Sequence, residues 1–135
     1  MVEAIRHATL IIIPIRPSLF DLAAVQDTIE IARELRKPYA CVINAAPARR
    51  NELDVAIVTE ARSSLEELRV PVWSGQITHR TDFALALRHG EGAKEYDAEA
   101  PAAQEITHLW TAIDRSVRAI NRAYKSARAM HRIAA

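Results

Sequence analysis

The feature that most constrains this fold is an apolar run that gives way within a few residues to a helical pattern. Residues 8–13 are mostly aliphatic, which is typical of a parallel-sheet strand covered on both faces. Ser18 begins the capping-box sequence Ser-Leu-Phe-Asp, in which the serine hydroxyl accepts a hydrogen bond from a first-turn N–H. The sequence therefore predicts a buried strand followed at once by a helix.

The predicted helix spans residues 19–36. Its apolar side chains recur at the three- and four-residue steps of one helix face, and they are Leu22, Val25, Ile29, Ala32 and Leu35. Pro38 disfavours helical backbone at Lys37, so we expect the helix to end there.

The strand and helix pattern then repeats along the chain. The predicted elements are a buried strand at residues 39–43, a helix from Asn51 with an apolar face of Val55, Val58, Leu65 and Leu68, a short strand at 70–73, and a helix at about 80–89. Strands that alternate with helices pair in parallel through right-handed crossovers. We therefore expect an α/β body over residues 1–100, with a parallel sheet of about three strands and flanking helices.

A long amphipathic helix is predicted from Pro101 to about residue 133, after a polar loop at residues 90–100. Proline suits the first turn of a helix, and the apolar positions that follow step alternately by four and three residues, as in a heptad seam. The seam residues are Ile106, Trp110, Ile113, Val117, Ile120, Tyr124, Ala127 and His131. We expect the first half of this helix to lie on the sheet, within the same domain, and the second half to bury its seam against a partner chain.

The charge of the chain is unevenly distributed although the net charge is only +1. Residues 1–100 carry 12 Lys/Arg and 15 Asp/Glu, whereas residues 101–135 carry 6 and 2. The basic residues of the last helix recur about once per turn, and they are Arg115, Arg118, Arg122, Lys125, Arg128 and Arg132. This stripe can follow a phosphate backbone without reading base sequence; it is equally compatible with the solvated face of a dimerising helix.

Several classes of site are not supported by the residues. The single cysteine, Cys41, lies in an apolar run and is expected to be a core thiol. The five histidines lack zinc-ligand spacing, and no Gly-x-Ser-x-Gly nucleophile motif is present, so we predict neither a metal site nor catalytic residues. The chain has no long apolar run and no secretory signal pattern, and a cytoplasmic, non-membrane protein is expected.

Three segments are expected to meet at the carboxyl ends of the strands, where open parallel sheets bind ligands. They are residues 14–21, 44–50 and 74–80, and their polar side chains are Arg16, Ser18, Asn44, Arg49, Arg50, Thr78 and Arg80. This set is rich in partners for anions and bases. Surface loops are polar in any protein, so composition alone does not decide between a ligand-binding site and ordinary solvated loops.

Several of these segments resemble the ParA/MinD-type partition ATPases, in particular the short ParA group that includes ParF. Residues 11–22 are similar to the proline-rich segment of that family, and residues 40–44 to its strand ending in asparagine. Residues 70–80 are similar to the strand and Ile-x-x-Arg loop that follow, and Phe83 to Leu87 with Gly90 to the next helix and glycine turn. The resemblance covers about residues 5–114.

This resemblance implies a P-loop fold that binds ATP and magnesium in a face-to-face dimer. It places Asn44 at the adenine edge, with Thr78 and Arg80 in the loop that flanks the base. It also implies a nucleotide-proximal dimer lip, consisting of Pro14, Arg16, Pro17, Ser18 and Asp21. The family acts in plasmid and chromosome segregation, binds DNA non-specifically and meets a centromere-binding partner protein.

The chain departs from the family at the phosphate-binding elements. Its only glycines are Gly75, Gly90 and Gly92, and no Gly-Lys pair is present, so the backbone cradle and lysine of a P-loop are missing. Pro14 stands where a Walker B strand would end in aspartate. The sequence thus resembles the C-terminal half of such an ATPase, and we expect no autonomous ATP hydrolysis and no bound cofactor in isolation. The alternative is a non-enzymatic, helix-mediated oligomeric adaptor or non-specific DNA-binding protein.

Overall fold

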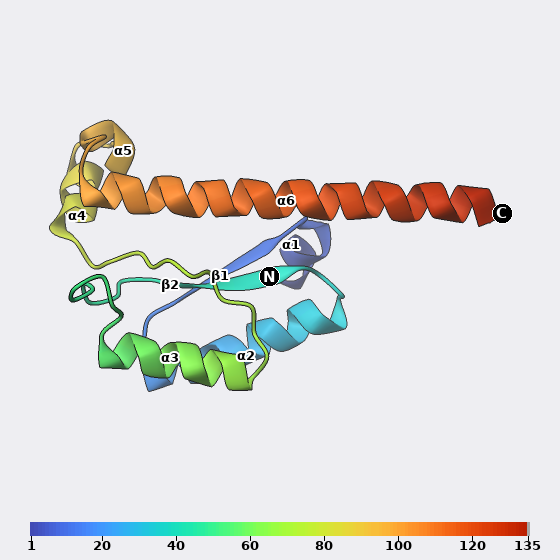
Figure 1. Ribbon diagram of the computed structural model, residues 1–135, viewed down its shortest axis with the longest axis horizontal. Coiled ribbons are helices and arrows are strands. Elements are labelled where there is room, and N and C mark those ends of the chain that lie inside the picture. Colours follow the sequence, from blue (N-terminus) through green and yellow to red (C-terminus); the bar gives the residue numbers. More distant parts are fainter. Residues whose placement is uncertain (135) are drawn as a thin grey trace.

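The computed structural model describes residues 1–134 and, of side chains, those of residues 1–133. The elements are arranged in three layers, with the sheet between one long helix and a pair of shorter helices (Figure 1). In chain order they are α1 (Val2–His7), β1 (Ile11–Ile15), α2 (Leu19–Glu34), β2 (Tyr39–Ile43), α3 (Ala56–Glu67), α4 (Thr81–Arg88), α5 (Ala93–Tyr96) and α6 (Pro101–Ala134).

The expected α/β class is confirmed by a parallel pair of strands. β1 and β2 pair in register from Ile11 with Tyr39 to Ile15 with Ile43, and α2 makes the crossover between them. The predicted cap of α2 is also confirmed, because Ser18 Oγ accepts the N–H of Asp21 at 3.2 Å. The capping residue therefore lies three residues after the end of β1, and the helix begins at the next residue.

The third predicted strand is present only as isolated parallel pairing along β2. The bridges are Cys41 with Val72 and Ala46 with Thr78, so the expectation of a regular strand at residues 70–73 was wrong. Pro71 has no N–H to donate, and the chain turns at Ser74 and Gly75 before pairing resumes. The described residues therefore form a two-stranded sheet that this irregular segment extends along β2.

The core fills the space between one sheet face and the α2–α3 pair. The residues that form it are Ile13, Ile15, Val25, Ile29, Cys41, Ile43, Ala46, Val58, Ala61, Leu65 and Val70. Cys41 is fully buried, as predicted, and burial raises the pKa of its thiol to about 11. The thiol is therefore protonated and unreactive at neutral pH.

The predicted start of α3 at Asn51 was wrong. Asn51 and Glu52 have φ values of 50° and 62°, and they lie in a tight turn closed by two backbone hydrogen bonds between Arg50 and Leu53. Asparagine tolerates this left-handed backbone, so Asn51 forms a turn and α3 begins five residues later. The short helices α1 and α5 were not predicted.

Pro14 lies inside β1, at its free edge. Ile11 N–H bonds to Pro38 O and Ile15 O accepts Asn44 N–H, so the odd-numbered residues of β1 face β2. The backbone groups of Ile12 and Pro14 therefore point to the unpaired edge, where a residue without an N–H breaks no hydrogen bond of the sheet.

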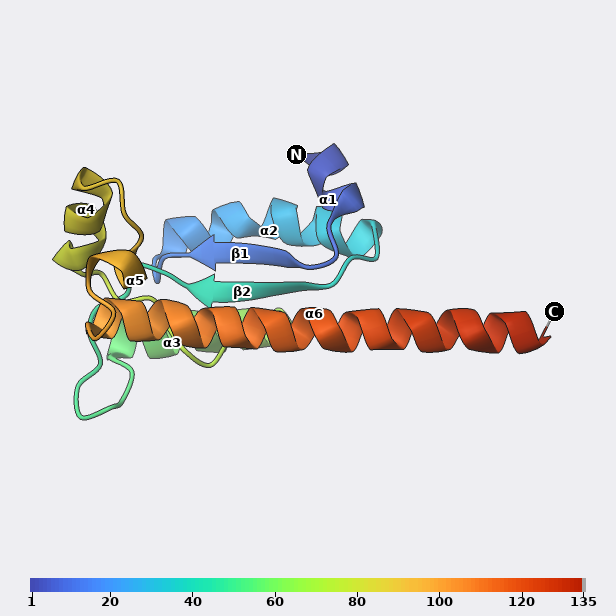
Figure 2. The same cartoon turned by 90° about the horizontal axis from the view of Figure 1, so that it is seen from above.

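The last helix is continuous, as predicted, and only its first half covers the body (Figures 1 and 2). Ala102 and Ala103 are buried and Ile120 is partly buried, whereas the side chains of residues 121–133 are all exposed. Within the described residues, no helix has the length and apolarity needed to cross a membrane.

We predict that Leu65→Ala lowers the free energy of unfolding by about 2–5 kcal/mol, because the change leaves a cavity among fully buried neighbours. Leu87 is the matched control, since it lies on a helix but is 77% exposed, and Leu87→Ala should cost less than about 0.5 kcal/mol. Urea denaturation measures both. Equal losses for the two variants would contradict this description of the core.

Candidate functional site at the carboxyl end of the sheet

An apolar groove of about 490 Å³ lies on the sheet face opposite α2 and α3. It is bounded by the sheet, α4 and the first turns of α6, and its apolar walls include Ile12, Val42, Ile77, Phe83, Ile106 and Leu109. Four predicted site residues also line this sheet-face groove, namely Pro14, Asn44, Thr78 and Arg80. Asn44, Thr78 and Arg80 are the residues that the resemblance places beside the base. The fold brings them together with Pro14, one residue of the predicted lip.

Asn44 follows β2, and its position is set by the N–H it donates to Ile15 O at 2.8 Å. Its side-chain amide forms no hydrogen bond with the described residues, although it is half-buried at the groove. Such an amide can donate and accept at the same time. Asn44 can therefore recognise the hydrogen-bonding edge of a planar ring.

Thr78 and Arg80 are engaged by Glu105 on α6, a residue that the sequence did not identify. Glu105 Oε2 accepts the N–H of Thr78 at 2.9 Å, and its Oε1 accepts Thr78 Oγ1 at 2.7 Å and Arg80 Nη2 at 3.0 Å. Burial raises the pKa of Glu105, but the hydrogen bonds from Arg80 and Thr78 outweigh it and hold the pKa below its usual value. The carboxylate is therefore ionised at neutral pH.

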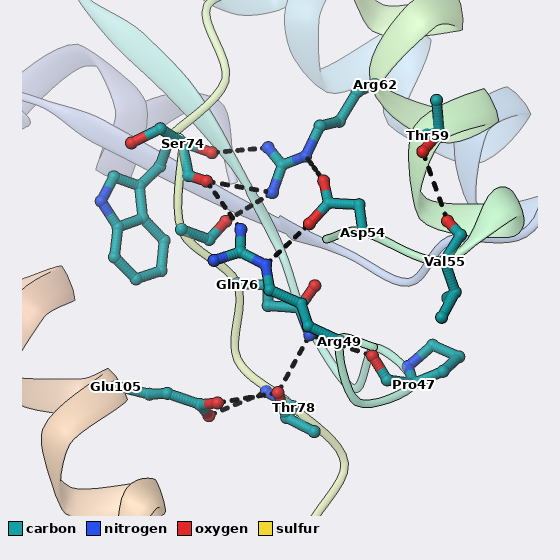
Figure 3. Close-up of polar contacts among 12 residues, drawn as sticks. Pro47, Arg49, Asp54, Val55, Thr59, Arg62, Ser74, Gln76, Thr78 and Glu105 are labelled. Atoms are coloured by element: carbon teal, nitrogen blue, oxygen red, sulfur yellow. Dashed lines mark hydrogen bonds and ion pairs between the residues drawn. The ribbon is translucent and has the colours of Figure 1, made fainter. Parts of the chain in front are cut away.

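A chain of hydrogen bonds continues from this carboxylate into the loop after β2 (Figure 3). Gln76 Nε2 donates to Thr78 Oγ1 at 3.0 Å and to Pro47 O at 2.9 Å. Gln76 is only 4% exposed, and its Oε1 has no partner among the described residues. Gln76 lines a second cleft of about 680 Å³, together with Arg49, Trp73 and His108.

A second ionic cluster fixes the loop that precedes Gln76 (Figure 3). Asp54 accepts hydrogen bonds of 2.7 Å from both Arg49 and Arg62. Burial raises the pKa of Asp54, but the two guanidinium groups outweigh it and lower the pKa overall. Arg62 also donates to the carbonyls of Trp73, Ser74 and Gly75. The turn is thereby held in place by α3.

Gly75 is required in this turn because the ring of Trp73 lies against it. A Cβ at position 75 would come within 2.4 Å of the indole, which is closer than side-chain atoms approach one another. Gly75 is therefore explained by close packing against Trp73, and it is not part of a phosphate-binding loop.

The other residues of the predicted lip do not line the sheet-face groove. Arg16 donates both its backbone N–H and its guanidinium to Asp21, and these hydrogen bonds lower the pKa of the Asp21 carboxyl. Pro17 and Ser18 line a different groove, between the start of α2 and α3. Arg16, Pro17, Ser18 and Asp21 therefore form a stiff, internally bonded turn beside the sheet-face groove.

The residues present fit the base of a nucleotide but not its triphosphate or magnesium ion. The groove offers apolar walls and the free amide of Asn44. Gly90 ends α4 with a φ of 72°, and Gly92 caps α5, so neither glycine lies at a strand-to-helix junction where phosphates are cradled. Among the described residues, no cluster of three or more His, Cys, Asp or Glu could hold a metal ion.

We predict that Glu105→Gln loosens the first turns of α6 and lowers the free energy of unfolding at pH 7 by about 1–3 kcal/mol, because it weakens the hydrogen bonds to Thr78 and Arg80. The pKa of Glu105 is lower in the folded chain, so its stabilising contribution is present at neutral pH and is lost as pH falls through the folded-state pKa. The difference between wild type and variant should therefore shrink as the pH falls below the usual pKa range of a glutamate. Glu99→Gln, at an exposed position, is the control; an unchanged difference at low pH would exclude the ionic contribution.

No family model and no curated protein sequence matches this chain. Among solved structures, McdA of Cyanothece in complex with ATP is similar, with a TM-score of 0.60 and 14% sequence identity. The match covers 90% of this chain and 45% of the McdA chain, so the chain spans less than half the length of that protein. At this identity the likeness concerns the fold alone: the chain shares the α/β fold of McdA over the part that it covers.

Proposed function

We propose that this chain is a ParA-like module that binds DNA non-specifically and oligomerises through α6, without ATPase activity of its own. The observation that carries the proposal is the exposed basic face of α6. The fold likeness to McdA supports the general class, since a ParA-type ATPase architecture is used to position cargo. The cargo here would be a plasmid or chromosome, in the cytoplasm, with a centromere-binding protein as a further partner.

The basic stripe is placed to meet a polyanion. All six cations are exposed, and the spacing puts Arg115, Arg118 and Arg122 on the side of α6 away from the body. Arg118 pairs with Asp114 at 2.9 Å but stays 72% exposed, and the other five have no ion-pair partner in the described part of the chain. From Arg115 to Arg132 the stripe is about 26 Å long, enough to follow several phosphates.

Asn44, Thr78 and Arg80 would contribute to binding of a nucleotide base. When the phosphate-binding half of the fold is supplied by another chain, the sheet-face groove would receive the base, with Asn44 at its edge. Thr78 and Arg80 would act by positioning the loop, because Glu105 already engages them.

We predict that Arg118→Ala, Arg122→Ala and Lys125→Ala together weaken binding of random duplex DNA. Each lost phosphate contact should reduce the slope of log affinity against log salt by about 0.9. Gel shifts at several salt concentrations measure both quantities.

The matched control removes the same charge from the body, with Arg6→Ala, Arg50→Ala and Arg88→Ala, all at exposed positions. This variant should keep most of the salt slope. If wild type shifts no DNA at low salt, the stripe is a solvated face, and the adaptor function becomes the better description.

We also predict that the chain alone binds ATP no more tightly than about millimolar, with no dependence on magnesium, because a base contributes only part of nucleotide affinity. Titration of a fluorescent ATP analogue measures this, with adenosine as the comparison. Micromolar, magnesium-dependent binding would refute our description of the phosphate side.

A further inference from the structure

Two aromatic side chains of α6 are exposed. Trp110 is 68% exposed and Tyr124 is 63% exposed, although the sequence pattern assigns both to an apolar seam. The rotation per residue of a helix places Trp110 about 60° around the axis from Ile113, which is partly buried against the body. Tyr124 comes after Ile120, the last partly buried residue of α6, so the body no longer covers it. Both rings are therefore accessible to a ligand.

Three cations of the basic stripe share this side of the helix. Arg128 comes 18 residues after Trp110, which is about five full turns, and Lys125 and Arg132 lie within about 60° of it around the axis. The guanidinium carbon of Arg128 lies 5.9 Å from the centroid of the Tyr124 ring, so this ring and this cation are held together. We call these five residues the aromatic–basic flank.

The flank has little negative charge beside it. Residues 115–133 contain six basic and no acidic side chains, and Asp114, the last acidic residue of α6, is already paired with Arg118 at 2.9 Å. An apolar protein surface laid on this flank would take cations out of water without giving them an acidic partner, which is unfavourable. A suitable ligand therefore carries negative charge and also offers flat apolar faces to the two rings.

We propose that the aromatic–basic flank binds single-stranded nucleic acid, with unpaired bases stacked on Trp110 and Tyr124 and phosphates at the three cations. The inference rests on the nucleic-acid part of the proposed function and deepens it by naming the form of nucleic acid that this side of α6 takes. An unpaired base has a free face that can stack on an aromatic side chain. The bases of a duplex are stacked on one another and present only their edges in the grooves.

The spacing of these side chains suits a strand laid along the helix axis. The rise per residue puts the two rings about 21 Å apart along the axis, and Trp110 about 33 Å from Arg132. Sites for single strands typically cover about 4–16 nucleotides, and this length is enough for several. The side chains of residues 121–133 are all exposed, and this part of α6 extends past the body (Figure 2). A strand can therefore reach Tyr124 and the three cations without obstruction by the body.

Two other cations of the stripe lie on a different side of α6. Arg115 and Arg122 are about 120–140° around the axis from Trp110. α6 has no tryptophan, tyrosine or phenylalanine besides the two of the flank, so Arg115 and Arg122 can meet phosphates but have no ring beside them for stacking. The two sides of the helix therefore differ in what they can recognise, and substitutions can separate them.

Fluorescence anisotropy with labelled oligo(dT) and with a duplex, each of about 20 nucleotides per strand, tests the proposal on the full chain. Trp110→Ala and Tyr124→Ala should each weaken oligo(dT) binding at least about fivefold, because each removes a stacking platform. Duplex binding should change less than about twofold, because its bases do not reach the rings. Tyr124→Phe keeps the ring and should bind oligo(dT) like wild type, whereas Tyr124→Leu keeps only apolar bulk and should bind like Tyr124→Ala.

Met130→Ala is the matched control, because Met130 is 71% exposed on the same free end of α6 but lies on another side of the helix. It should leave the affinity for both nucleic acids unchanged, and circular dichroism should show the same helix content in every variant. If loss of both rings leaves oligo(dT) binding unchanged, or if Tyr124→Leu binds like wild type, the inference is wrong while duplex binding by the stripe still stands. A wild-type chain that binds neither nucleic acid at low salt would overturn the inference and the proposed function together.

Discussion

The carboxylate of Glu105 fixes how α6 sits on the rest of the molecule. It binds the backbone and hydroxyl of Thr78 and the guanidinium of Arg80, and so joins the first turns of α6 to the irregular segment along β2. Because α6 is straight and continuous, this anchor at one end also sets the direction of the projecting end. This anchor therefore also determines where the basic stripe and the apolar seam of α6 lie relative to the body.

The same anchor shapes the candidate site. The first turns of α6 form one wall of the sheet-face groove, so a change at Glu105 would open the groove as well as release the helix. Gln76 extends the network to the loop after β2, and Arg62 holds the turn at Gly75 from the opposite layer. Asn44 is left as the one predicted base-side residue whose side chain is free among the described residues. In this site Gln76, Thr78 and Arg80 are held by hydrogen bonds, and the Asn44 amide is free to bind a ligand.

Local patterns in the sequence predicted much of this fold. The Ser18 cap, the two strands and α6 each depend on spacing within a few residues, and each was confirmed. Asn51 was misplaced because a capping residue and a left-handed turn residue are often the same amino acid, and only the backbone pairing of Arg50 with Leu53 decides between them. The third strand failed because Pro71 and the Trp73–Gly75 contact interrupt a run whose composition suits a strand. Glu105 lies 27 residues from Thr78, and no local pattern marks a contact of that range.

The sheet has a free edge at β1 and one face that is only partly covered. Parallel sheets are stable when both faces are covered, yet here α2 and α3 cover one face while α6 covers only part of the other. Pro14 removes one backbone donor from the free edge of β1, which weakens strand addition there but does nothing for the open face. The projecting half of α6 carries most of the basic stripe together with apolar side chains such as Tyr124, and it has no partner among the described residues. In the single chain, therefore, part of this sheet face stays open at the groove, while the outer arginines of α6 remain in solvent.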